Sequence, residues 1–272
     1  MPSGVVAEPH DPEDEMRPHT QQRPTSERSG FTLVELLIVI AIIAIIASIA
    51  IPKFSSARLT ANESAAIATL RAVTTAQNIM RTQGSVDTDG DGAGEFAFLA
   101  ELAGTVPMRI GAPGGAAIGL NGLDTLDPAS LSVVFGSTQA DGNGEGVIQR
   151  QGYVYKVYLP GADAAGLVPA VAEVGTGGSA DPVVADSNNG ELYWCVYAWP
   201  IEYGASGRRM FFANEDGVIL QYLNSDTRYE GVDAADMPSW DEAFTTAGDM
   251  SSPLALNGAV SGSSGIGWTQ VQ

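Results

Sequence analysis

An acidic residue inside an apolar stretch is the first feature of this 272-residue chain that could have a chemical role. Glu35 lies in the run Phe31–Ile51, where Thr32 and Ser48 are the only other polar residues. If the chain began at Phe31, the Glu35 carboxylate would stand one helical turn from a free α-ammonium group. A charge in lipid is strongly disfavoured unless it is paired, and a helix amino end favours an anion. We expect Glu35 to pair with such an amine, within one chain or between neighbours; the alternative is a Glu that reaches the membrane interface from the first turn.

A second group of carboxylates has the spacing of a calcium-binding loop. The group consists of Asp87, Asp89, Asp91 and Glu95, with Gly92 at the sixth position. Alternate residues of a tight turn direct their oxygens toward one centre, which suits Ca²⁺. Phe98 stands at the twelfth position, where an EF-hand requires a bidentate Glu, so an EF-hand is excluded. A looser calcium site and a solvated turn both remain open, and Asp141-Gly-Asn143-Gly-Glu145 is a weaker version of the same pattern.

The counts of other residue types argue against an enzyme. His10 and His19 are the only histidines, so a chain that lost its first 30 residues would have no imidazole for a Ser-His-Asp triad or a zinc site. Cys195 is the only cysteine and lies in an apolar run, which predicts a buried structural residue. The formal net charge of −19 makes nucleic acid an unsuitable partner, because such a surface repels phosphates.

The apolar run has the length of a membrane span. Its 21 residues would form about 31 Å of helix, which matches a hydrocarbon core of about 30 Å. A secretory signal peptide cleaved near Ser48-Ile49-Ala50 is the alternative. The length of the run, Pro52 directly after that point and the helical pattern that continues over 55–83 favour a membrane helix.

The sequence Gly30-Phe31-Thr32-Leu33-Val34-Glu35-Leu36 resembles the leader junction of type IV pilins and type II secretion pseudopilins. The resemblance covers about residues 29–84. It implies that a prepilin peptidase cleaves between Gly30 and Phe31 and methylates Phe31, and that Glu35 neutralises the amine of a neighbouring subunit during assembly. Pro52 is the 22nd residue counted from Phe31, which is also a family position.

The leader departs from the commonest family pattern, because its first half is acidic rather than short and basic. A start at Met16 would leave a basic leader with Arg17, Arg23 and Arg28, as the positive-inside rule favours. Either start yields the same mature chain, with 10 basic and 26 acidic residues.

The pattern beyond the leader predicts an α+β fold with a long first helix and an antiparallel sheet. We expect a leader at 1–30, a membrane or filament-core helix at 31–51, the outer half of the helix at 52–84 with a kink at Pro52, and a head at 85–272. Gly84 is the expected helix end. One sheet face should pack on the helix. The expected strands are Tyr153–Leu159, Leu192–Trp199, Arg209–Ala213 and Val218–Tyr222, with a hairpin at Asp216-Gly217 and poorly ordered segments at 162–190 and 248–272.

Three classes of function follow from these features. The first is a structural subunit, a pseudopilin or minor pilin, with prepilin peptidase, other subunits, the inner-membrane assembly platform and membrane lipid as partners. Its leader would be cytoplasmic and its head periplasmic, until a periplasmic or extracellular filament forms. The second is a tethered periplasmic protein that binds calcium or another ligand and does not polymerise. The third is a secreted enzyme, which the lack of a nucleophile–base pattern disfavours.

Overall fold

A computed structural model of the chain describes residues 30–112, 115–118, 125–179 and 185–271. The predicted leader at 1–29 lies outside these residues. The chain divides into two compact units, Met1–Ile49 and Ala50–Gln272. The helices are α1 (Leu33–Gln83), α2 (Leu99–Leu102), the 3₁₀ helix η1 (Val133–Gly136) and α3 (Ser187–Gly190). The strands are β1 (Arg109–Ala112), β2 (Gly115–Ile118), β3 (Gln139–Ala140), β4 (Gly146–Arg150), β5 (Tyr153–Pro160), β6 (Ala170–Ala172), β7 (Cys195–Pro200), β8 (Met210–Asn214), β9 (Leu220–Tyr222) and β10 (Thr269–Gln270).

The helix α1 has the predicted extent. It ends at Gln83, and Gly84 follows with a φ of 60°, the left-handed conformation that glycine adopts without strain. Pro52 lies inside α1, and the kink expected there stays a prediction. The α+β class is confirmed: a long helix precedes an antiparallel sheet.

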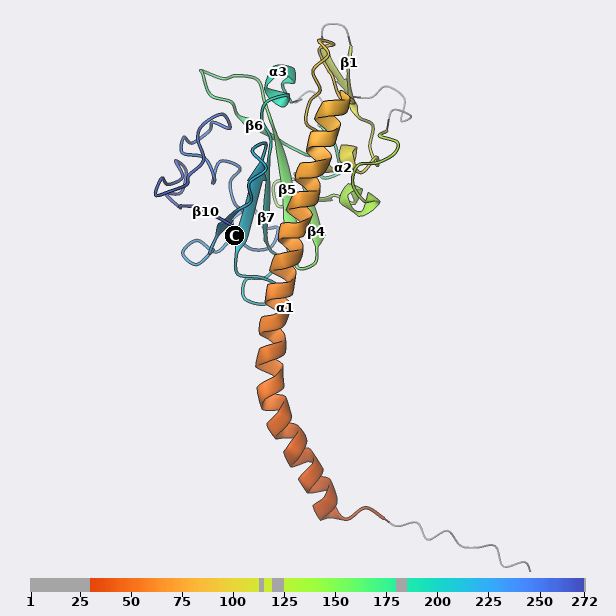
Figure 1. Cartoon of the computed structure of the whole chain (residues 1–272), viewed down its shortest axis with the longest axis vertical. Helices are drawn as coiled ribbons and strands as arrows, with labels where there is room; N and C mark the ends of the chain where they lie inside the picture. Colours follow the sequence, from red (N-terminus) through yellow and green to blue (C-terminus); the bar gives the residue numbers. More distant parts are fainter. Residues whose placement is uncertain (1–29, 113–114, 119–124, 180–184, 272) are drawn as a thin grey trace, which may run out of the picture. The chain divides into compact units, whose positions relative to one another are not determined.

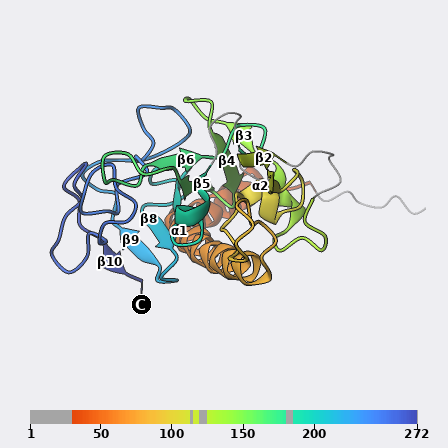
Figure 2. The ribbon, with the colours of Figure 1, turned by 90° about the horizontal axis from the view of Figure 1, so that it is seen from above.

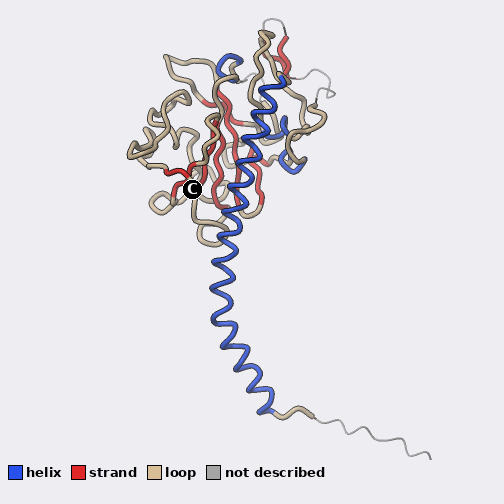
Figure 3. Tube along the Cα trace, in the orientation of Figure 1, coloured by secondary structure: helices blue, strands red, loops and turns tan. Residues whose placement is uncertain are grey.

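The main sheet is antiparallel, with the strand order β10-β9-β8-β7-β5-β4-β3, and β6 also pairs with β5. The predicted strands are confirmed with small shifts; β7, for example, begins at Cys195 rather than at Leu192. The predicted hairpin lies between β8 and β9, where Gly217 has a φ of 72° and donates a hydrogen bond to the Asn214 carbonyl. Figure 1 shows β5 and β7 beside α1, and Figure 3 shows that loops form most of the rest of the head.

One face of the sheet packs on the outer half of α1, as expected. The helix contributes a stripe of fully buried side chains: Ala66, Leu70, Val73, Ala76 and Met80. Alternate residues of the strands complete this core, such as Tyr155 and Val157 of β5 and Phe211 of β8. Polar contacts fix the helix as well, because the buried Gln77 amide accepts from the Ala97 N–H at 2.9 Å and donates to its carbonyl at 2.7 Å.

The other face of the sheet is also buried, which the sequence analysis did not predict. Tyr197 and Trp199 of β7 and Met210 and Phe212 of β8 form a second core with residues of the C-terminal segment. Seen from above, α1 lies on one side of the sheet and the C-terminal loops lie on the other (Figure 2). Continuous apolar strands such as β7 are typical of sheets covered on both faces.

The described parts of 162–190 and 248–272 consist mainly of loops, as expected, but the prediction that these loops are poorly ordered was wrong. The first contains β6 and α3, and the second ends in β10. Trp268 is 2% exposed, its Nε1 donates to the Glu242 carbonyl at 2.8 Å, and its ring centroid lies 5.8 Å from that of Phe212. The segments are rich in Gly and Ser, but they contain a few apolar residues, such as Trp268, that pack on the aromatic face of the sheet.

We predict that Trp268→Ala destabilises the head by about 3–5 kcal/mol, because the substitution empties a buried site between three aromatic rings. Urea unfolding of the full chain in detergent would measure this change. Leu223→Ala is the matched control, since Leu223 is 67% exposed and its loss should change the free energy of unfolding by less than about 0.5 kcal/mol. Equal stability of the two variants would contradict the packing role of Trp268.

A buried carboxylate gives the head a second testable property. Glu173 is 1% exposed; its Oε1 accepts N–H groups of Ala100 at 2.9 Å and Gly178 at 3.0 Å, while its Oε2 has no hydrogen-bond partner among the described residues. Burial raises the pKa of Glu173 to about 8, and the negative charge of Glu101 adds to the rise. The carboxyl group is therefore protonated in the folded head at neutral pH.

We predict that the head loses stability as the pH rises from about 4.5 to about 8. In this window the folded state holds a proton that the unfolded state has released, so the free energy of unfolding falls by about 1 kcal/mol per pH unit. The Glu173→Gln variant should lose this contribution. Thermal unfolding of both proteins across pH 5–9 would show it, and identical slopes would contradict the assignment.

Candidate functional site

The amino end of α1 holds the predicted assembly residue. Thr32 precedes the helix, and Glu35 is the third helical residue. The Glu35 Oε2 accepts hydrogen bonds from the Thr32 N–H at 2.9 Å and from its hydroxyl at 2.7 Å, and the Glu35 N–H donates to the Thr32 Oγ1 at 3.2 Å. This reciprocal pair is a capping box, which satisfies backbone donors at the start of a helix.

The capping box leaves part of the carboxylate available. The Glu35 Oε1 makes no hydrogen bond to another described residue, whereas Oε2 is held by Thr32. The pattern Thr-x-x-Glu is readable from the sequence and is the local signal for this cap, which the prediction for Glu35 alone did not include. Thr32 therefore positions the carboxylate, whose remaining oxygen can accept from an external ammonium group.

The first half of α1 is apolar on all sides, and its large apolar side chains are not buried by any other described residue. The large apolar residues from Phe31 to Ile51 are exposed, with Phe31 at 83% and Ile51 at 66%. Among the described residues, α1 is the one helix long and apolar enough to cross a membrane. Such a surface is stable only in lipid or against other apolar helices. Gly30 precedes it and is exposed, so the predicted cleavage position is accessible in the chain.

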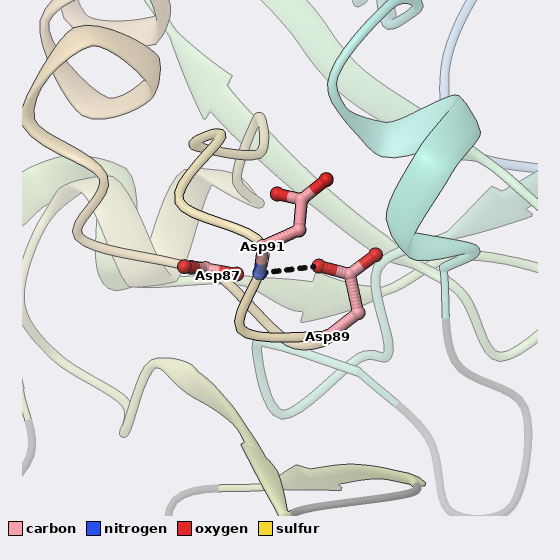
Figure 4. Close-up of side chains that lie close together, drawn as sticks. All are labelled: Asp87, Asp89 and Asp91. Atoms are coloured by element: carbon pink, nitrogen blue, oxygen red, sulfur yellow. Dashed lines mark hydrogen bonds between the residues drawn. The ribbon is translucent and has the colours of Figure 1, made fainter.

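The predicted calcium loop is present as a cluster of three carboxylates. Asp87, Asp89 and Asp91 each offer one oxygen within 4.8 Å of the others (Figure 4). Loop N–H groups already bond some of these oxygens: Asp87 accepts from Gly90 at 2.7 Å, and Asp89 accepts from Asp91 at 3.2 Å. These hydrogen bonds can hold the turn without a cation. The three converging carboxylates could also bind a cation.

The fourth predicted ligand, Glu95, lies elsewhere. Its side chain is 1% exposed, its Oε1 accepts from the Thr88 N–H at 2.7 Å, and its Oε2 lies 3.4 Å from the Arg109 guanidinium. Arg109 also pairs with the buried Glu101 at 3.1 Å. Burial raises the pKa of Glu95, and the positive charge of Arg109 opposes this rise. Glu95 belongs to an internal ion-pair network and not to the exposed cluster.

Tertiary structure adds a different carboxylate near the cluster. Glu191 follows α3, its Oε1 is buried without a hydrogen-bond partner among the described residues, and burial raises its pKa. The negative charges of Asp91, Asp89 and Glu95 raise that pKa further. About 100 residues separate Glu191 from the loop in the sequence, so no local spacing could reveal it.

The weaker acidic pattern is an ion-pair cluster. Both Asp141 and Glu145 contact the Nζ of Lys156, with 2.6 Å between Nζ and the Glu145 Oε2. Lys156 is 1% exposed, so its charge is balanced inside the head. This pairing accounts for both carboxylates without a metal.

The calcium site stays a prediction, now with Asp87, Asp89 and Asp91 as ligands. We expect calcium to raise the melting temperature of the full chain, because a ligand of the folded state stabilises it. Asp89→Asn/Asp91→Asn should weaken calcium binding at least about tenfold in a titration, since two of three charges are lost. Asp226→Asn/Asp233→Asn, two exposed acids elsewhere, is the control. A wild-type chain that binds no calcium would leave the loop as a hydrogen-bonded turn.

Comparison with known proteins supports the importance of the amino end. Residues 26–51 match the family model "Prokaryotic N-terminal methylation motif". The chain is 38% identical over 101 residues to the type IV major pilin protein PilA of Myxococcus xanthus strain DK1622. That match covers 37% of this chain and 45% of the relative, so it spans less than half the length of either protein. No solved structure matches the chain.

Proposed function

We propose that this chain is a structural subunit of a filament, as type IV pilins and pseudopilins are. The match of residues 26–51 to the N-terminal methylation motif and the similarity to a type IV major pilin support this proposal. A prepilin peptidase would cleave it between Gly30 and Phe31 and methylate Phe31. The mature helix would then leave the inner membrane and enter the core of a filament. The exposed apolar half of α1, with one carboxylate in its first turn, is the observation that carries the proposal.

This half of α1 suits two environments in turn. In the membrane its side chains face lipid, and in a filament the same side chains face the helices of other subunits. Both environments lack water, so neither requires the surface to change. The energetic difference between them is therefore small for the apolar residues, and a polar contact can decide between them.

Glu35 supplies such a contact. Cleavage after Gly30 creates an ammonium group at Phe31, and a carboxylate that is held by Thr32 with one oxygen free can pair with the ammonium of a neighbour. In a low-dielectric environment this pairing is strong, and an unpaired charge is costly. This ion pair between Glu35 and the Phe31 ammonium would align a newly added subunit with the subunit before it.

We assign the chain to the minor pilins or pseudopilins rather than to the major pilins, because a head of about 190 residues is bulky for the main repeating subunit of a filament. Copies of a less abundant subunit can still be neighbours in the filament. The leader would lie in the cytoplasm and the head in the periplasm until the inner-membrane assembly platform extracts the subunit. The alternative is a membrane-tethered periplasmic protein that does not polymerise and binds calcium or another ligand. The cluster of Asp87, Asp89 and Asp91 is the observation that favours this second function.

Intact mass and amino-terminal sequencing of the membrane protein would test the processing step. With an active prepilin peptidase, we expect a chain that begins at methylated Phe31; without the enzyme, the leader should remain. An uncut leader in both strains would favour the tethered protein. A chain that begins at Ile51 would indicate a secreted domain and overturn the role of Glu35.

Glu35→Gln tests assembly separately, because the amide oxygen can still accept from Thr32 while the charge is lost. We expect normal cleavage and membrane insertion but at least about tenfold fewer subunits in sheared filaments, since the amine of the neighbour loses its partner. Ser48→Ala is the control, because the Ser48 hydroxyl bonds only to the Ile45 carbonyl in the same helix. Normal filaments from Glu35→Gln would contradict the charge-pairing step.

A further inference from the structure

Charge is divided unevenly between the outer half of α1 and the rest of the head. Residues 52–84 contain four basic residues, Lys53, Arg58, Arg71 and Arg81, and a single acidic one, Glu63. Residues 85–272 contain 24 acidic and 6 basic residues. The helix is thus the basic element of a strongly acidic head.

The one acidic residue of this helical segment is used inside the head. Glu63 is 8% exposed, and its Oε2 lies 2.6 Å from the guanidinium of Arg209. Its Oε1 accepts the Arg208 N–H at 3.1 Å. By contrast, Lys53, Arg58 and Arg71 are exposed and form no ion pair with another described residue. The exposed charged residues of this helical segment are therefore all cationic.

In the rest of the head, residues 85–272, the exposed charges are mainly negative. Three of its six cations are bound internally, because Arg109 and Lys156 pair with buried carboxylates and Arg209 pairs with Glu63. Many of its acids are exposed to solvent; these include Asp163, Glu202, Asp216, Asp226, Asp233 and Asp236. Identical heads packed closely around a shaft would repel one another unless cations lay between them.

The cationic face of α1 also has the shape of a contact surface. A shallow groove of about 300 Å³ runs beside the helix and is lined by Ala65, Ala68, Ala72, Phe135 and Arg150. The small side chains permit close approach of another segment. Beside Phe135 in the sequence, Val133 and Val134 are 68% and 46% exposed, so two more apolar side chains lie next to the groove residue Phe135 in the chain.

We infer that the exposed face of α1 from Arg58 to Ala72, with its groove, is the docking surface for the acidic head of a second copy of this chain. The inference rests on the proposed filament function. Charge complementarity selects the partner, since the head carries the acidic surface that the helix lacks. The apolar groove supplies the contact area between the cations.

Anionic lipid headgroups are the competing ligand for a cationic segment close to a membrane span. Lys53 follows the span directly, and headgroups would account for it. Arg71 lies 20 residues beyond Ile51, which corresponds to about 30 Å along a helix. The headgroup layer extends only about 5–8 Å beyond the hydrocarbon core. A headgroup contact therefore does not explain Arg71, whereas a neighbouring head does.

The full-length variant Arg58→Glu/Arg71→Glu tests the inference. We expect normal processing at Phe31 and normal membrane insertion, but at least about tenfold fewer subunits in filaments, because like charges now face each other. Arg58→Lys/Arg71→Lys should assemble normally. Arg228→Glu, which reverses an exposed cation outside the helix, is the matched control and should also assemble. Wild-type filaments should dissociate more readily in 1 M salt than in 0.1 M salt.

A photo-crosslinking residue in place of Ala68 identifies the occupant of the groove. We expect adducts with peptides from residues 85–271 of a second copy, and only in filaments. Adducts with lipid or with a different protein, or normal filaments from Arg58→Glu/Arg71→Glu, would overturn the inference while the filament function stands. If the wild-type chain forms no filament and keeps its leader, the proposed function and this inference fall together.

Discussion

The burial of one stripe of α1 against the sheet is the interaction on which the head depends. Ala66, Leu70, Val73 and Met80 lie at helical spacing and are shielded completely from water. The stripe forms the helical side of the first core, and buried polar groups such as Gln77 fix the helix in one register. Without this face, the sheet would expose the aromatic residues of β5 and β8 that point toward the helix. One face of the antiparallel sheet is thus covered by a single helix.

The same helix has three surfaces with different chemistry. The first half is apolar all round, the outer half has an apolar stripe toward the sheet, and its remaining face carries Arg58 and Arg71 without an internal partner. Each surface requires a different environment: lipid or other helices, the sheet of the same chain, and water or an acidic neighbour. The proposed function, storage in a membrane followed by packing among other subunits, requires such a division, because every contact must be available on one element.

The head achieves its stability without disulfides. Cys195 is buried and free, and burial raises its pKa well above the ordinary value, so it is a small apolar residue of the second core. Buried ion pairs around Arg109 and Lys156, together with the C-terminal segment anchored by Trp268, hold the long loops instead. Ion pairs of this kind specify geometry more than they add stability, whereas the aromatic contacts contribute through buried area.

The sequence by itself determined the features that depend on neighbours in the chain. The extent of α1, its end at Gly84, the hairpin at Gly217 and the position of Glu35 follow from apolar periodicity, glycine conformation and spacing, all of which are local. Only the tertiary structure decided which surfaces are covered and which charges are paired. It placed Glu95 with Arg109, brought Glu191 to the acidic loop and folded the C-terminal segment over the sheet. These contacts join residues far apart in the chain, and their energies depend on burial, which no local pattern encodes.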